Sequence, residues 1–148
     1  MTDKKVFGFT CGAFDLLHVG HIHLLAYCKT KCDSLIVGLH TDPTIDRPTT
    51  KNKPIQSMYE RYYQLAGSKF VDGIIPYDTE YDLLNMMGTI EINIRFVGSD
   101  YEDKPITGSE LCKELGIKIE YVPRMHSYSS TDLRTRILLE SMSRDYGK

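Results

Sequence analysis

The sequence contains no apolar run that approaches the roughly 20 residues needed for a membrane-spanning helix. Its first residues also lack the apolar stretch of a secretory signal peptide. Excess charge is missing as well, because 20 acidic side chains nearly balance 18 basic ones and leave a net charge of −2. Such a composition does not predict the basic surface typical of a nucleic-acid-binding protein. We therefore expect a cytoplasmic protein whose partners include neither a membrane nor a nucleic acid.

Cysteine is scarce, with four residues in a chain of 148. A chain of this length can bury a core without disulfides. Cys28 and Cys32 lie four residues apart, so a helix would carry both thiols on one face. That spacing allows a metal site, but no second cysteine or histidine pair follows at zinc spacing. Buried free thiols are therefore the favoured interpretation, and a metal site is the alternative.

Internal repeats and low-complexity segments are absent too, and the length fits one domain over residues 1–148. Short β-rich runs alternate with amphipathic stretches along the chain. Strands are expected at Lys5–Cys11, Ser34–His40, Val71–Pro76, Ile92–Val97 and Ile117–Val122. Helices are expected at Val19–Lys31, Ser57–Ser68, Glu80–Met87, Ser109–Leu115 and Thr131–Met142, followed by a polar tail. This order predicts a Rossmann-like open α/β fold, in which a parallel five-stranded sheet carries helices on both faces.

Ligands of such sheets bind outside the carboxyl ends of the strands, near a switch in strand order. The segment that leaves the first expected strand contains Gly12, Ala13, His18, Gly20 and His21. Gly12 allows a sharp turn, and Ala13 leaves room beside it. A helix that begins near His18 places its free N–H groups and positive dipole end at this edge. Gly20 leaves the backbone open, and the three-residue spacing puts both imidazoles on one helix face. The segment therefore predicts a site where a triphosphate can bind.

Two histidines at a helix start have simpler explanations, since they can cap the helix or pack against it. A metal site is another alternative, although Asp15 is the acidic side chain that lies nearby in the sequence. We favour the anion site because the pair occupies the first strand-to-helix junction of an α/β pattern. Asp15 is then expected to orient the loop backbone or a histidine, and His23 is expected to face elsewhere on the surface.

The pattern Gly12-x-Phe14-Asp15-x-x-His18-x-Gly20-His21 resembles the signature of the cytidylyltransferases, a family of the HxGH nucleotidyltransferase superfamily. The resemblance runs from about Val6 to Ile137 and is greatest to glycerol-3-phosphate cytidylyltransferases. Three further segments resemble family motifs: Lys69-Phe70-Val71-Asp72 resembles R-Y-V-D, Gly98-Ser99-Asp100-Tyr101 resembles G-D-D-W, and residues 124–131 (RMHSYSST) resemble R-T-E-G-I-S-T-T.

The resemblance implies roles for individual residues. Catalytic roles are implied for His18, His21, Lys53 and Arg124. Nucleotide contacts are implied for Cys11, Gly12, Ala13, Phe14, Gly20, Gly98, Asp100, Arg124, Tyr128, Ser129, Ser130 and Thr131. Acceptor contacts are implied for Asp15, Lys51 and Lys69, and no protein ligand to a metal is implied.

The residue types after the fifth expected strand support the same interpretation. Arg124 can grip phosphate oxygens with two N–H groups. Ser129, Ser130 and Thr131 lie at the start of the last expected helix, where hydroxyls and free N–H groups can face an anion. Ser129 can equally act only as a helix cap. A solvent-exposed basic loop is likewise the simple explanation for Lys51 and Lys53.

The resemblance implies an enzyme that transfers CMP from CTP to a phosphorylated small alcohol, with glycerol 3-phosphate favoured, and releases pyrophosphate. Mg²⁺ would accompany the nucleotide, held by phosphates and water, and a homodimer is expected. One alternative is the same chemistry with ATP on a phosphorylated cofactor precursor or sugar phosphate. A second is a nucleotide-binding module without catalysis. Lys69 replaces an arginine of the motif, and the stretch Tyr77–Asp82 is acidic, which leaves the acceptor open.

Overall fold

The computed structural model describes residues 3–144, so the last four residues of the predicted polar tail lie outside the described part. Within that part, no helix has the length and apolar character needed to cross a membrane. The strands are β1 (Phe7–Gly12), β2 (Ser34–His40), β3 (Gly73–Tyr77), β4 (Ile94–Gly98) and β5 (Lys118–Val122). The helices are α1 (Val19–Thr30), α2 (Met58–Ala66), α3 (Glu80–Thr89), α4 (Ser109–Leu115) and α5 (Ser130–Ser143). A short 3-10 turn, Ser99–Tyr101, was not predicted.

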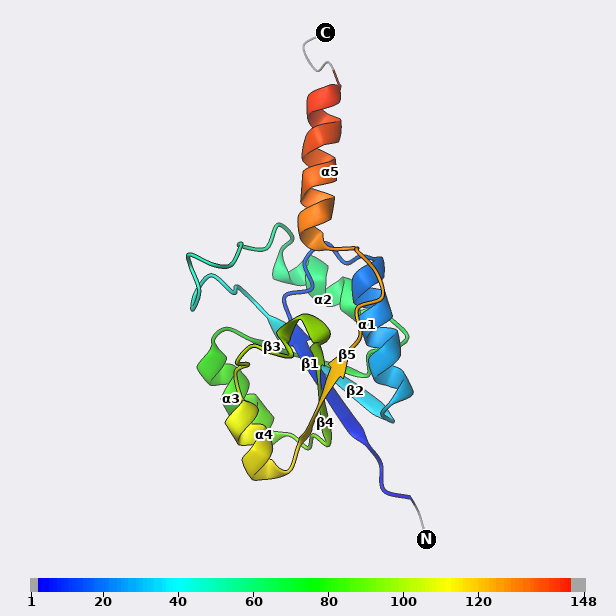
Figure 1. Cartoon of the computed structure of the whole chain (residues 1–148), viewed down its shortest axis with the longest axis vertical. Coiled ribbons are helices and arrows are strands. Elements are labelled where there is room, and N and C mark those ends of the chain that lie inside the picture. Colours follow the sequence, from blue (N-terminus) through cyan, green and yellow to red (C-terminus); the bar gives the residue numbers. More distant parts are fainter. Residues whose placement is uncertain (1–2, 145–148) are drawn as a thin grey trace.

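The strands form one parallel sheet in the order β3-β2-β1-β4-β5. The chain builds outward from β1 to β3 and then returns to place β4 on the other side of β1. The switch in strand order therefore falls between β1 and β4 (Figure 1). β1 pairs with β4 only at Gly8 and Phe9, so the carboxyl half of β1 lies beyond this ladder. This geometry confirms the predicted Rossmann-like α/β fold.

Helices cover both faces of the sheet, as predicted (Figure 1). On one face, Leu25 of α1 and Leu65 of α2 pack in a buried cluster with sheet residues such as Leu35. On the other, Met87 of α3 and Cys112 of α4 belong to a second buried cluster. Burial of both sheet faces explains why the central strands read as nearly continuous apolar runs.

The ends of several helices carry strong local signals. Ser57 caps α2 and Thr79 caps α3, each with an acidic side chain three residues on that completes a capping box. Gly116 ends α4 with a φ of 70°, a backbone conformation that glycine adopts without strain, and this confirms the predicted stop. These signals placed the middle helices to within about two residues.

All four cysteines are free, as predicted. Cys28 and Cys112 are buried, and burial raises the pKa of the Cys28 thiol. The Cys32 thiol donates to the carbonyl of Cys28 at 3.3 Å instead of facing a metal.

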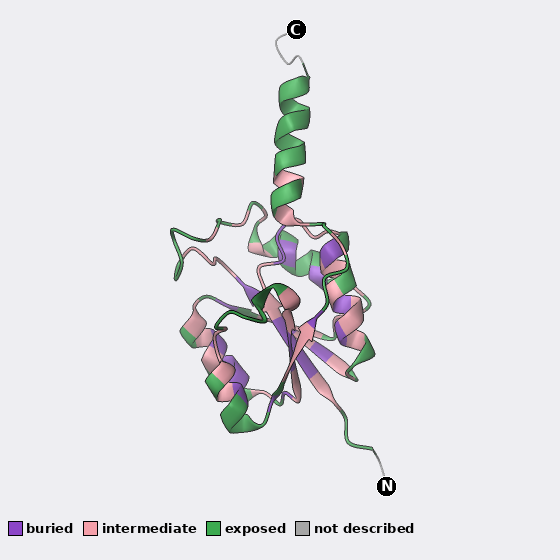
Figure 2. Ribbon diagram, viewed as in Figure 1, coloured by how far each residue is buried: buried purple, intermediate pink, exposed green. Residues whose placement is uncertain are grey.

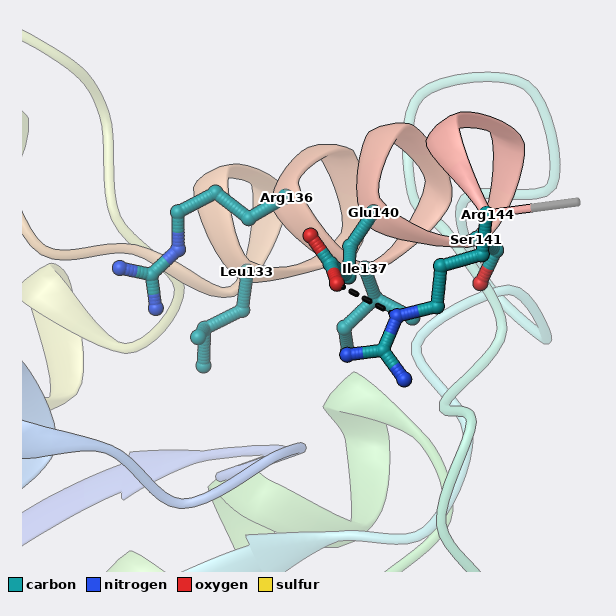
Figure 3. Close-up of a pocket in the computed structure, with 6 residues that line it drawn as sticks. All are labelled: Leu133, Arg136, Ile137, Glu140, Ser141 and Arg144. Atoms are coloured by element: carbon teal, nitrogen blue, oxygen red, sulfur yellow. Dashed lines mark hydrogen bonds and ion pairs between the residues drawn. The ribbon is translucent and has the colours of Figure 1, made fainter.

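Helix α5 stands apart from the rest of the protein (Figures 1 and 2). None of its residues is buried, and its apolar side chains Ile137, Leu138, Leu139 and Met142 are all more than half exposed. A shallow hollow of about 480 Å³ follows one side of the helix, where Leu133 and Ile137 lie one turn apart (Figure 3). Arg144 bonds Glu140 beside them at 2.7 Å. The hollow includes none of the predicted site residues.

Candidate active site

The loop that leaves β1 makes its turn at an unexpected place. Phe14 and Leu16 have φ angles of 49° and 52°, in the left-handed region that side chains other than glycine rarely adopt. Gly12, predicted to provide the turn, is instead the last residue of β1. Phe14 is only 5% exposed and packs in the core, so burial of its ring holds the loop in this conformation. The predicted role of Gly12 in the turn is thus corrected.

His18 and His21 begin α1, as predicted. His18 is the cap residue, and its Nδ1 accepts the N–H of Gly20 at 3.0 Å. Nδ1 of His21 accepts the N–H of His18 at 3.2 Å. A backbone N–H can only donate, so each neutral ring must carry its own proton on Nε2. The two rings stack with their centroids 3.8 Å apart. Capping and ligand binding therefore use opposite nitrogens of the same side chains.

Both imidazoles are held in the neutral form. Burial, followed by the nearby His126 and Arg124, lowers the pKa of His18. Burial and the adjacent His18 lower the pKa of His21 to about 3, against a smaller opposing effect of Asp15. Near pH 7 the pair therefore offers two N–H donors without positive charge, beside the N–H groups of the helix start.

His126, which the sequence analysis did not single out, lies against this helix start. A Cβ atom built on Gly20 would come within 2.7 Å of Cε1 of His126 and 2.8 Å of Cε1 of His18. Only glycine leaves room for both rings here. His126 also contacts His23 edge-on, with centroids 5.6 Å apart. His23 therefore does not face away from the site, which corrects the prediction.

Asp15 lies at the centre of the loop's contacts and is only 6% exposed. Its two carboxylate oxygens accept the N–H groups of Ile55 at 2.8 Å and Gln56 at 2.9 Å. Arg134 of α5 donates to the same carboxylate at 2.9 Å. Burial alone would raise the pKa of Asp15, but these three donors outweigh it and hold the pKa below its usual value. The expected orienting role is thus observed, whereas the implied contact with the acceptor stays a prediction.

Arg61 is a second organising residue that the sequence analysis missed. It lies on α2, is 2% exposed, and donates to the backbone carbonyls of Ala13 at 3.0 Å, His40 at 2.7 Å and Thr41 at 2.7 Å. Its Nε donates to the carbonyl of Gln56 at 3.1 Å. One guanidinium therefore ties together the segments that leave β1 and β2.

The other side of the site comes from β4, β5 and the start of α5. Gly98 ends β4, and Asp100 lies in the 3-10 turn that follows. Arg124 pairs with Asp100 at 3.1 Å and donates to the carbonyl of Tyr128 at 2.8 Å. These contacts bring the predicted nucleotide-binding residues of the two strands together at the carboxyl edge of the sheet.

The start of α5 combines the two roles considered for it. Ser129 caps the helix by accepting the N–H of Asp132 at 3.0 Å. Ser130 donates its hydroxyl to the carbonyl of Asp15 at 2.9 Å. Thr131 follows in the first turn. The predicted cap is confirmed, and this helix start lies beside the loop that leaves β1.

The three predicted lysines do not share one position. Lys51 and Lys53 lie in the segment after β2, at the carboxyl edge, and Lys53 lines a hollow of about 380 Å³. Lys69 precedes β3 and therefore lies at the opposite edge, where the neighbouring Asp72 accepts the N–H of Leu35 at 2.8 Å. The Lys69 ammonium sits over the ring of Phe70. The structure does not bring Lys69 to the site, which corrects its implied acceptor role.

Cys11 lies one residue before the end of β1, with its sulfur 3.9 Å from the guanidinium of Arg95. Over residues 3–144, no cluster of three or more histidine, cysteine, aspartate or glutamate side chains is arranged to hold a metal ion. The side chains of this site therefore do not form a cage for Mg²⁺, and no step is assigned to a protein-bound metal.

Comparison with known proteins gives a consistent result. The Cytidylyltransferase-like family matches residues 9–136. Bifunctional protein HldE from Sulfurimonas denitrificans is 40% identical over 114 residues, which are 76% of this chain and 23% of that protein. HldE from Granulibacter bethesdensis is 32% identical over 130 residues, 88% of this chain and 27% of that protein. The chain thus spans about a quarter of the length of these curated relatives.

Solved structures show the same fold. The lipopolysaccharide core biosynthesis protein from Thermoplasma volcanium has a TM-score of 0.65 and 27% identity, covering 85% of this chain and 100% of that one. Pantoate-beta-alanine ligase from Francisella tularensis has a TM-score of 0.55 and 19% identity, covering 98% of this chain and 74% of that one. With the family match over most of the chain and the His18–His21 helix start in place, this protein belongs to the cytidylyltransferase-like family of the HxGH nucleotidyltransferase superfamily.

Proposed function

We propose that this protein transfers a nucleotidyl group from a nucleoside triphosphate to the phosphate of a small acceptor. A phosphate oxygen of the acceptor attacks the α-phosphorus of the nucleotide, a new P–O bond forms, and the bond to the β-phosphate breaks to release pyrophosphate. The observation that carries this proposal is the helix start at His18 and His21, where two neutral Nε2–H donors accompany free backbone N–H groups at the switch in strand order.

The chemistry needs no covalent intermediate with the protein. His18 and His21 donate hydrogen bonds to oxygens whose negative charge grows in the transition state. Arg124 and the start of α5 hold the leaving phosphates, while the backbone around Gly20 lets the nucleotide approach α1 closely. Mg²⁺, when bound to the triphosphate, supplies neutralising charge from the nucleotide side. The protein's own contribution is positioning and charge stabilisation.

CTP is the first candidate for the nucleotide, because the chain matches the Cytidylyltransferase-like family over residues 9–136. ATP is the second, favoured by the relationship to the HldE proteins. The Francisella ligase was solved with beta-gamma ATP, so this fold also accommodates an adenine nucleotide. Asp100 at the carboxyl edge supports either base, since a carboxylate accepts from the exocyclic amino group that cytosine and adenine share.

The acceptor we propose is a small phosphorylated polyol or sugar, with glycerol 3-phosphate and sugar phosphates as the two cases. The relationship to a lipopolysaccharide core biosynthesis protein favours a sugar phosphate. The acidic stretch after β3 does not argue against a phosphate, because its charges are used internally. Asp78 accepts from the hydroxyl of Thr41 at 2.6 Å, Glu80 pairs with Arg47, and Asp82 caps the start of α3.

A pyrophosphate-release screen tests the proposal. It crosses CTP, ATP and UTP with glycerol 3-phosphate, phosphoethanolamine, phosphocholine and several sugar phosphates. Release that requires both a triphosphate and one acceptor supports nucleotidyl transfer and identifies both substrates. Tight binding of a triphosphate without release from any pair would instead support a nucleotide-binding module.

We also propose that the protein is a homodimer that uses α5. Exposed apolar side chains on an isolated helix are unfavourable in water, and a second copy of the chain would bury them. The exposed residues Ile137, Leu138, Leu139 and Met142 supply that surface.

A further inference from the structure

His126 reaches the catalytic helix start from a distant part of the chain. It belongs to the segment between β5 and α5, yet its Cε1 atom and that of His18 both approach the same point above Gly20. His126 is half-buried between this point and the ring of His23. The R-T-E-G-I-S-T-T motif that this segment resembles has glutamate at the corresponding position, so the imidazole is a feature of this chain.

The hydrogen bonding of His126 fixes which nitrogen carries the proton. Its Nδ1 accepts the N–H of Tyr128 at 3.2 Å, so the neutral ring carries its proton on Nε2. His18 and His21 have the same arrangement, with Nδ1 bound to a backbone N–H. Among the described residues, nothing accepts a hydrogen bond from Nε2 of His126. The ring is thus a third Nε2–H donor beside the helix start, without an acceptor from the protein.

A purely structural role is the competing explanation. The ring contacts His23 and Tyr128, each at a centroid distance of 5.6 Å, and it anchors the backbone of its own loop. Those contacts use the ring faces and Nδ1, and they leave Nε2 available. A glutamate carboxylate at this position would repel phosphate, whereas an imidazole N–H can bind it.

We propose that His126 binds the triphosphate of the nucleotide through its Nε2–H, as a third histidine of the site. This inference rests on the nucleotidyl transfer proposed above. It makes His126 a nucleotide-binding residue contributed by the β5–α5 segment, whose neighbours Arg124 and Ser130 already contact Asp100 and the loop that leaves β1.

Two substitutions separate the two roles of the ring. His126→Asn places an amide oxygen near the position of Nδ1, so it keeps the bond to Tyr128 and loses the distal donor. His126→Gln places an amide N–H near the position of Nε2 and loses the bond to Tyr128. We would measure dissociation constants for CTP, ATP and tripolyphosphate by calorimetry, KM and kcat by pyrophosphate release, and Tm by thermal unfolding.

The proposal predicts that His126→Asn weakens binding of the preferred triphosphate about tenfold or more with an unchanged Tm. KM should rise by a similar factor while kcat changes little, because the contact exists before the reaction. His126→Gln should bind the triphosphate more tightly than His126→Asn. Wild-type affinity in His126→Asn, with a lowered Tm in His126→Gln, would overturn the proposal and assign His126 to loop anchoring. If the wild-type protein binds none of the three ligands, the proposed function fails along with this inference.

Discussion

The carboxylate of Asp15 and the guanidinium of Arg134 form an ion pair at 2.9 Å, although the two residues lie 119 positions apart. The pair joins the loop that leaves β1 to the base of α5. Because Asp15 also accepts the N–H groups of Ile55 and Gln56, three separate parts of the chain meet at one buried carboxylate. The loop in front of His18 is therefore positioned by residues that come much later in the sequence.

Loss of this carboxylate's charge should destabilise the fold. We expect Asp15→Asn to lower the free energy of unfolding by about 2–3 kcal/mol, because a partly buried Arg134 loses its partner. Urea denaturation measures the change. Asp132→Asn is the matched control, since Asp132 forms an exposed pair with Arg136 at 3.6 Å and should change stability by less than about 1 kcal/mol. Equal effects in the two variants would mean that the Asp15 pair has no special weight.

Arg61 should be equally difficult to replace. Arg61→Met leaves four backbone carbonyls without their donor, so we expect a loss of about 3–5 kcal/mol in unfolding free energy. Arg61→Lys should restore little of it, because one ammonium cannot reproduce the fork of N–H groups. Gln64→Met, on the exposed side of the same helix, should stay within about 0.5 kcal/mol. A stable Arg61→Met variant would show that these carbonyls find other partners.

The lowered pKa of His21 predicts a stability that depends on pH in the acidic range. The unfolded chain protonates this imidazole near pH 6.5, whereas the folded protein resists protonation until about pH 3. Acidification therefore favours the unfolded state, and stability is fully present above about pH 6.5. From pH 7 to pH 5 the wild-type protein should lose about 2 kcal/mol through this group.

The control for this pH dependence is His21→Asn, which keeps an acceptor for the N–H of His18 and removes the titrating group. Its unfolding free energy should fall by about 2 kcal/mol less over the same pH interval. Parallel curves for the two proteins would show that the His21 pKa is not depressed.

The proposed dimer can be disrupted at α5 without touching the core. Leu138 is 60% exposed, so Leu138→Glu should leave the monomer folded and abolish the dimer. Ser141→Glu, on the same helix, adds the same charge at an exposed polar position and should leave the dimer intact. Light scattering coupled to size-exclusion chromatography reports the mass of each protein. A monomeric wild-type protein at about 100 µM would rule out the dimer.

The parts of the site that could be predicted are those encoded locally. His18 and Gly20 lie in one short segment, so their spacing revealed both the helix start and the anion site. Gly116 and Ser129 likewise announced the end of one helix and the start of another. The same local logic failed for Gly12, because the turn is held by the burial of Phe14 and not by a flexible backbone.

The residues that could not be predicted act over long sequence distances. Arg61 looks like one charge on an amphipathic helix, and only the folded chain shows that it faces three carbonyls from other segments. His126 lies more than one hundred residues from His18, and no local pattern connects them. Lys69 failed in the opposite way, because a motif match could not reveal that its segment precedes β3 and lies at the far edge of the sheet.

The central claim is that the Nε2–H of His18 stabilises the transition state of nucleotidyl transfer. The most direct test measures kcat for pyrophosphate release by His18→Asn with the donor and acceptor pair found in the screen. Asparagine keeps an acceptor for the N–H of Gly20, so α1 stays capped while the Nε2–H is lost. We predict that kcat falls by about two orders of magnitude or more with an unchanged Tm. A kcat within about threefold of the wild-type value would contradict the claim.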